Sequence, residues 1–160
     1  MAIKTPISVA TCGGLFKIMI SFNKIGDLNT DWLHVYISDQ KKIGEAYLYN
    51  FNNSFDINKN TYDILSEKND LYLNPNNCFF VSDFKIYEPY RGMGYSKILL
   101  ENILNMTKTY NVKYVYLNCK KNNEIALNLY KKYNFEKYGE NDIDYVLIYK
   151  VPDIIWGGLK

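Results

Sequence analysis

The sequence predicts a mixed α/β fold: a mostly antiparallel sheet with one parallel strand pair and flanking helices. Three stretches rich in β-branched and aromatic residues follow one another in the first half, whereas the second half alternates strand-like and helix-like patterns. The chain has 160 residues, of which 48% are hydrophobic, which is enough for one domain with a core of its own. We therefore expect residues 1–160 to form a single domain.

Polar turns bound the three expected strands of the first half, which are Leu15–Asn23, Trp32–Ser38 and Ile43–Phe51. Consecutive strands joined by such turns pair most simply as an antiparallel meander. The following segment, Asn52–Asn77, is polar, rich in asparagine and broken by Pro75. We expect it to be mostly loop, with room for one helical turn.

The second half begins with a strand at Cys78–Tyr87, followed by a glycine turn and a helix after Gly94. A strand at Val112–Asn118, a second helix, and strands at Phe135–Tyr138 and Ile143–Val151 complete the chain. Because a helix separates the first two of these strands, we expect them to pair in parallel through a right-handed crossover.

Each expected helix shows an apolar face at helical spacing. In the first helix the residues that form it are Leu99, Ile103, Met106 and Tyr110. In the second helix they are Ile125, Leu129 and Tyr133, with Ala126 and Tyr130 alongside. These faces are expected to pack on the sheet.

The composition argues against several classes of function. The net charge is only +2 and the basic residues are scattered among 17 acids, so no nucleic-acid partner is indicated. Cys12, Cys78 and Cys119 form no C-x-x-C pair, and His34 is the only histidine. Neither a metal site nor a disulfide framework is therefore predicted, and a reduced, cytoplasmic setting fits best.

No membrane span or cleaved leader is predicted either. The apolar stretch Leu15–Phe22 is interrupted by Lys17 and is far shorter than the ~20 residues that a membrane-spanning helix requires. We therefore expect no membrane association.

The stretch EPYRGMGYSKILLENIL carries the strongest functional signal. A strand that ends in glycines and leads directly into a helix presents unpaired backbone N–H groups at the positive end of the helix dipole, where anions bind. Gly92 and Gly94 allow close approach of phosphate oxygens, Ser96 is small, and Arg91 is the only arginine of the chain. The alternative is a tight strand-to-helix turn without a ligand. The P-loop spacing is absent, and Lys97 stands where a dinucleotide fingerprint would have its third glycine.

Two segments resemble the GNAT superfamily of acyltransferases. IYEPYRGMGYSKILL is similar to the coenzyme A loop of that family, (Q or R)-x-x-G-x-(G or A), with Arg91 at the first position, Gly94 at the fourth and Ser96 in place of the final small residue. NNEIALNLYKKYNF is similar to N-x-x-A-x-x-L-Y-x-x-x-G-F. The matching residues there are Asn123, Ala126, Leu129, Tyr130 and Phe135, and Asn134 replaces the glycine.

The resemblance implies a splayed pair of parallel strands that holds acetyl-CoA between them. The pantetheine arm would meet the main chain of Phe84, Lys85 and Ile86. The phosphates would lie on the amides of the glycine turn, with Lys97 nearby; these amides belong to Arg91, Gly92, Met93, Gly94, Tyr95 and Ser96. Asn123 would also hold the cofactor, with helix N-capping as its alternative role. Tyr130 would protonate the departing thiolate, with packing as its alternative.

The implied function is N-acetyl transfer from acetyl-CoA to a primary amine of a protein, peptide, polyamine or other small molecule. A non-catalytic module of the same fold, binding coenzyme A or a protein partner, is the alternative. The likeness covers residues 78–151, whereas residues 1–77 show strands where the family usually has helices that bear on substrate choice. The acceptor is therefore undefined, and either a monomer or a homodimer is compatible with the sequence.

The general base is the role for which the sequence offers no candidate on the strand before the glycine turn. Several family members carry a glutamate there, but strand alternation gives this chain a face without carboxylates, made of Phe80, Ser82, Phe84 and Ile86. The same alternation places Asp83 on the opposite face. We therefore predict that no carboxylate of this strand is the base and that water or a backbone carbonyl helps to remove the proton of the amine. Glu45 and His34 are alternatives that would act through water, although each is better explained as an exposed strand residue.

Overall fold

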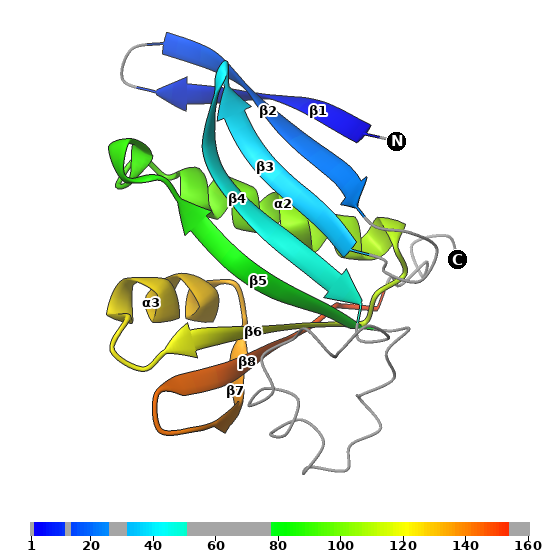
Figure 1. The fold of residues 1–160 in the computed structure, drawn as a ribbon, viewed down its shortest axis with the longest axis vertical. Coiled ribbons are helices and arrows are strands. Elements are labelled where there is room, and N and C mark those ends of the chain that lie inside the picture. Colours follow the sequence, from blue (N-terminus) through cyan, green and yellow to red (C-terminus); the bar gives the residue numbers. More distant parts are fainter. Residues whose placement is uncertain (1, 12–13, 26–31, 51–77, 154–160) are drawn as a thin grey trace, which may run out of the picture.

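The structure, a computed structural model, describes residues 2–11, 14–25, 32–50 and 78–153. Eight strands form one sheet in the order β1-β2-β3-β4-β5-β6-β8-β7 (Figure 1). The strands are β1 Ala2–Thr11, β2 Gly14–Ile25, β3 Trp32–Asp39, β4 Lys41–Asn50, β5 Cys78–Ile86, β6 Tyr114–Lys120, β7 Glu136–Glu140 and β8 Asp144–Lys150. Two α-helices, α2 Tyr95–Thr109 and α3 Glu124–Lys132, and a 3₁₀ turn at Glu88–Tyr90 complete the described elements.

The first four strands form the antiparallel meander that the sequence predicts. The three expected strands are present, and the expected loop at Asn52–Asn77, like Phe51, lies outside the described residues. Strand β1 was not expected. It contains Pro6, which has no N–H to donate to a sheet, and it lies at the edge of the sheet, where such a residue is tolerated.

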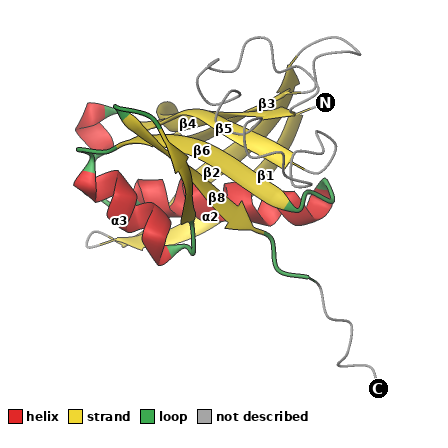
Figure 2. Ribbon diagram, turned by 90° about the horizontal axis from the view of Figure 1, so that it is seen from below, coloured by secondary structure: helices red, strands yellow, loops and turns green. Residues whose placement is uncertain are grey.

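The second half confirms the predicted strand–helix–strand unit. Strands β5 and β6 pair in parallel, and β8 continues the sheet antiparallel to β6, with β7 at the edge. Both helices lie on the same face of the sheet (Figure 2). One core cluster joins side chains of α2 and α3 to β3, β4, β5 and β6, so this helix-bearing face holds the main core.

The buried face of α2 agrees with the prediction except at its end. Leu99 and Ile103 are fully buried and Met106 nearly so, whereas Tyr110 follows the last helical residue and is 41% exposed. The prediction for α3 was wrong at Ile125, which is 87% exposed. The helix instead turns Tyr130 inward, because burying this larger aromatic side chain removes more apolar surface from water.

A second cluster lies on the opposite face of the C-terminal half of the sheet. It consists of Cys78, Phe80, Tyr116, Val146 and Ile148. Burial raises the pKa of the Cys78 thiol to about 12, so this cysteine behaves as a small apolar residue.

Gly44 in β4 marks a close approach between β4 and β5. A Cβ at this position would lie 2.5 Å from Cδ1 of Ile86 and 2.6 Å from the carbonyl oxygen of Lys85. Cβ atoms in proteins essentially never lie this close to other heavy atoms. The carbonyl also belongs to the backbone, which has little freedom to move. Only glycine therefore allows β4 to lie this close to the end of β5.

We expect Gly44→Ala to lower the free energy of unfolding by about 1–3 kcal/mol, because the added methyl group overpacks this contact. Urea denaturation of the variant and the wild type measures the loss. The double variant Gly44→Ala/Ile86→Val removes Cδ1 but leaves the carbonyl contact, so it should recover only part of the stability. Unchanged stability of the single variant would show that the strands can separate at no cost.

Candidate active site

A cleft opens where the parallel pair separates. Strands β5 and β6 are paired only from Cys78 with Tyr114 to Val81 with Leu117, although both strands continue for several residues. The cleft has a volume of about 1080 Å³, at the upper end of the roughly 300–1,000 Å³ typical of ligand pockets. Its walls are the ends of both strands, the glycine turn, and the start of α3. This divergence is the splay that the resemblance implied.

A β-bulge in β5 alters the faces that strand alternation predicts. Asp83 has a φ of 52°, and the register shifts so that Asp83 and Phe84 together lie opposite Ala46 of β4. Phe84 and Ile86 consequently pack with the helix-bearing core, whereas Phe80 belongs to the opposite cluster. The predicted common face of Phe80, Ser82, Phe84 and Ile86 was therefore wrong beyond Ser82. The prediction for Asp83 was also wrong: Asp83 is exposed and lines the same cleft as Phe84 and Ile86, so this strand brings one carboxylate to the cleft.

The glycine turn adopts the backbone conformation that the sequence predicts. Gly92 and Gly94 have φ values of 76° and 85°, and a Cβ at either position would meet no described atom within 4 Å. Packing therefore does not require glycine at these positions, and the open space beside the backbone faces the cleft, which both residues line. A backbone free of side chains at the mouth of a cleft is what close approach of an anion requires.

The start of α2 leaves its amides available to a ligand. Gly94 is the N-cap residue, and no described side chain caps this end of the helix. The N–H groups of Tyr95, Ser96 and Lys97 belong to the first turn, where an α-helix has no acceptor of its own. Together with the helix dipole, these donors make the end of the cleft attractive to phosphate groups.

Arg91 fixes the glycine turn to the end of β5. Its Nε donates a hydrogen bond of 2.9 Å to the carbonyl oxygen of Ile86. This bond spans the 3₁₀ turn and holds the chain in position before Gly92. Part of the guanidinium group is therefore occupied by the backbone, while the residue also lines the cleft.

Most residues predicted to hold the cofactor line the cleft. They are Phe84, Lys85, Ile86, Arg91, Gly92, Gly94, Tyr95, Ser96 and Asn123. Met93 and Lys97 do not belong to the lining, and Met93 is 63% exposed. An amide of Met93 and a side chain of Lys97 would thus act only at the edge of the cleft.

Tyr130 lines the cleft from α3 and is only 5% exposed. Its ring contacts Phe84 of β5 and Phe135 edge to face, with centroid distances of 6.1 and 5.4 Å. Burial, and to a smaller extent the neighbouring Cys119, raises the pKa of the phenol well above its usual range. The hydroxyl therefore keeps its proton at neutral pH, so Tyr130 can donate a proton but cannot serve as a base.

Asn123 caps α3, which is the alternative role considered from the sequence. Its Oδ1 accepts a hydrogen bond of 3.2 Å from the N–H of Ala126. The helix ends after Lys132, and Asn134 adopts a φ of 66°, the left-handed conformation expected where the related segments have glycine.

The end of β6 contributes cleft residues that the sequence did not indicate. Asn118, Cys119 and Lys120 line the wall opposite β5. Burial raises the pKa of the Cys119 thiol to about 11, so this thiol stays protonated. The predicted parallel pairing could have indicated these residues, because ligands of parallel strand pairs lie beyond the carboxyl ends of both strands.

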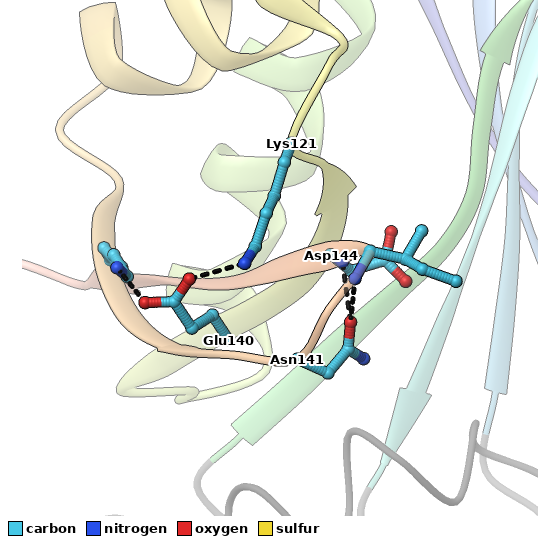
Figure 3. A network of polar contacts seen from close by, with 6 residues as sticks. Lys121, Glu140, Asn141 and Asp144 are labelled. Carbon is cyan, nitrogen blue, oxygen red and sulfur yellow. Dashed lines mark hydrogen bonds and ion pairs between the residues drawn. The ribbon is translucent and has the colours of Figure 1, made fainter.

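A polar network supports this wall from behind (Figure 3). Nζ of Lys121, the residue directly after β6, lies 2.6 Å from Oε2 of Glu140. Oε1 of Glu140 forms a second ion pair with Nζ of Lys137. In the β7–β8 turn, Oδ1 of Asn141 accepts hydrogen bonds from the N–H groups of Ile143 and Asp144 at 2.8 and 2.7 Å. The hairpin is thus fastened to the end of β6, and the two lysines lower the pKa of Glu140 to about 2.

The described part of the chain shows neither a metal site nor a membrane-spanning helix. No group of three or more His, Cys, Asp or Glu side chains there could hold a metal ion. None of the described helices is long and apolar enough to cross a membrane.

Comparison with known proteins assigns the chain to a family. Residues 27–135, more than half of the chain, match the Acetyltransferase (GNAT) family. The chain belongs to this family. An N-alpha-acetyltransferase of Sulfolobus acidocaldarius is 43% identical over 53 residues, which is 32% of each chain. The match thus spans about a third of that relative, and the GNAT assignment rests on the family match.

Solved structures share the fold at low sequence identity. Ard1 from Thermoplasma volcanium superimposes with a TM-score of 0.55 at 16% identity, covering 75% of this chain and 71% of that one. The PaiA N-acetyltransferase from Thermoplasma acidophilum, in complex with coenzyme A, gives 0.53 at 16% identity, with 77% and 62% covered. The ribosomal-protein-S18-alanine N-acetyltransferase from Escherichia coli gives 0.54 at 13%, with 80% and 73% covered.

The cap formed by Asn123 can be separated from any contact with a cofactor. We expect Asn123→Ala to lower the free energy of unfolding by about 1 kcal/mol, because α3 loses its side-chain cap, and Asn123→Ser to retain most of it. Urea denaturation measures both. If Asn123 also holds the cofactor, titration with acetyl-CoA will show weaker binding in both variants. Wild-type stability of Asn123→Ala would mean that the cap contributes nothing.

Proposed function

We propose that the protein is an acetyl-CoA-dependent N-acetyltransferase that acts on a primary amine. The observation that supports this most directly is the cleft between β5 and β6, which joins an uncapped helix start and two open glycines to a buried, protonated tyrosine. Membership of the GNAT family supports the same class of reaction.

The residues present fit acetyl-CoA. The amides from Gly92 to Ser96 would bind its phosphates, because the glycines leave the backbone open there, whereas the N–H of Arg91 already donates a hydrogen bond of 3.2 Å to the carbonyl oxygen of Glu88. The main chain of Phe84, Lys85 and Ile86, which forms one wall of the cleft, would pair with the pantetheine arm. When bound, the cofactor supplies an acetyl group activated as a thioester.

Tyr130 is assigned the role of proton donor. As the C–N bond to the amine forms and the C–S bond breaks, the phenol would protonate the departing sulfur, and the proton that the nitrogen loses as the amide forms would restore the phenol. A phenol is protonated at neutral pH at its usual pKa, and burial raises the pKa of Tyr130 further. The amine must first lose its own proton, at a cost of about 4–5 kcal/mol at neutral pH for a pKa near 10.4, and we assign this proton to water.

Acetyl-CoA should stabilise the native protein in a manner that depends on the glycine turn. At a hundredfold excess over Kd, the expected gain is roughly 2.7 kcal/mol, seen as a higher melting temperature. Gly94→Val should abolish the gain relative to its own ligand-free melt, because the side chain fills the space that phosphates require and disfavours a φ of 85°. Ile143→Val, at an exposed position outside the cleft, is the control and should retain the gain. A wild type that shows no shift at millimolar acetyl-CoA would reject the cofactor and favour the non-catalytic module.

Tyr130→Phe should lower kcat by on the order of 10²–10⁴ while the affinity for acetyl-CoA stays nearly unchanged, since only the proton donor is lost. Release of the thiol in the presence of a panel of amines measures turnover. Tyr133→Phe, directly after the end of α3, is the control. This variant loses a hydroxyl that donates a hydrogen bond of 2.6 Å to Oε1 of Glu101. Tyr133 does not line the cleft, so the variant should keep the wild-type turnover. Equal turnover of Tyr130→Phe and wild type, with the chemical step rate-limiting, would assign Tyr130 to the core alone.

A further inference from the structure

A buried carboxylate lies on the face of the sheet opposite the helices, outside the catalytic cleft. Glu45 of β4 is 6% exposed, although the sequence predicted an exposed strand residue. Its Oε2 lies 2.8 Å from Nζ of Lys42 and 3.5 Å from Nε2 of His34, and its Oε1 lies 3.7 Å from Nζ of Lys85. His34, also expected to be exposed, is largely buried beside it.

Aromatic rings flank the ammonium groups that contact this carboxylate. Nζ of Lys42 lies 5.8 Å from the centroid of the Tyr36 ring, and Nζ of Lys85 lies 5.7 Å from that of Tyr87. An ammonium group is thus held both by an ion pair with the carboxylate and by cation–π attraction to a ring. We call the group formed by Glu45, Tyr36 and Tyr87 the cation seat.

Lys42 reaches the cation seat because of a second β-bulge. The register between β3 and β4 shifts after Ile37, so that Ile43 and Gly44 both point to the helix-bearing core and Lys42 emerges on the same face as Glu45. Burial acts to raise the pKa of Glu45, but hydrogen bonds from Lys42 and Tyr87 outweigh it and lower the pKa to about 2. The carboxylate is therefore ionised throughout the physiological range.

The cation seat adjoins the cleft. Lys85 lines the cleft, and its ammonium group contacts Glu45. The two residues also lie opposite each other in the pairing of β4 with β5. Neighbouring strands lie about 4.8 Å apart, so Glu45 is one strand spacing from the wall of the cleft. A molecule whose amine enters the cleft can therefore extend a second group a few bonds long to the seat.

We propose that the cation seat binds a second primary ammonium group of the acceptor, several bonds away from the nitrogen that is acetylated. This inference rests on the proposed function. In the free protein the ammonium of Lys42 occupies the seat and shows which chemistry fits it. The Lys42 side chain is 43% exposed, so its ammonium group can move into water when another ammonium group takes its place beside Glu45. Lys42 then competes with the acceptor for the carboxylate of Glu45, and Glu45 determines which amines are preferred as acceptors.

Two kinds of acceptor carry this chemistry: a free diamine, or a peptide whose lysine side chain lies next to its amino terminus. Matched pairs of probes distinguish them. The first pair is 1,4-diaminobutane and 1-aminobutane; the second is a peptide with lysine at position two and the same peptide with norleucine there. Within each pair only the second ammonium group differs.

We expect wild-type kcat/KM to favour the charged member of one pair roughly tenfold or more, beyond the twofold statistical advantage of a symmetrical diamine. Glu45→Gln should reduce this preference to within a few fold, mainly through KM. Lys42→Ala should increase it, since the competitor is gone. The opposite signs of the two variants would not arise from a structural role of either residue. Lys41→Ala, an exposed lysine beside Lys42, is the control and should leave the preference unchanged.

Binding provides a readout that needs no turnover. Calorimetry should give 1,4-diaminobutane a Kd about tenfold higher with Glu45→Gln than with the wild type, and a lower Kd with Lys42→Ala. Acetylation of both members of each pair at equal kcat/KM would overturn the cation seat and leave the proposed function standing. Equal Kd values in wild type and Glu45→Gln would overturn the seat as well. Binding without acetylation of any probe would support the seat and count against the proposed function.

Discussion

The early end of the parallel pairing between β5 and β6 is the constraint on which the rest of the site depends. Beyond Val81 and Leu117 the two strands no longer share hydrogen bonds, and the edges of both become walls of the cleft. The bulge at Asp83 begins this divergence, because a positive φ bends β5 away from β6 while it keeps its pairing with β4. Gly44 makes that retained pairing possible by letting β4 approach Lys85 and Ile86.

The divergence also determines what can line the cleft. A continuous sheet would bury the main chain of β5, whereas a splayed strand offers its N–H and C=O groups to a ligand without leaving them unpaired in the core. The glycine turn then places the helix dipole of α2 at one end of this strand, and α3 places Tyr130 at the other wall. The proposed phosphate-binding turn and the proposed proton donor are thus separated along one cleft.

The sequence predicted the glycine turn and both helices, because each depends on local chemistry, such as positive φ at Gly92 and Gly94. The place of Tyr130 in the cleft was predicted from the family resemblance and not from helical spacing. It could not predict the faces of β5 beyond Ser82. Strand alternation assumes regular pairing, and a bulge depends on the partner strand as well as on the residues of the strand itself. The predicted burial of Ile125 was wrong for a related reason. Two adjacent faces of α3 have similar apolar patterns, and packing against Phe84 of β5 buries the face that carries Tyr130.

Glu45 shows most clearly why a buried charge could not be predicted from the sequence. A lone glutamate in a strand reads as exposed, because burial of an unpaired charge is costly. Its burial depends on Lys42, which a bulge brings to the same face, and on Tyr87 from beyond β5. With its pKa lowered to about 2, the carboxylate stabilises the fold above the pKa of an unfolded glutamate, and this contribution is lost only as the pH falls toward 2. The same low pKa makes Glu45 a poor acceptor for the proton of an amine, so a group that sequence alone would consider as a base is better suited to hold a cation than to remove its proton.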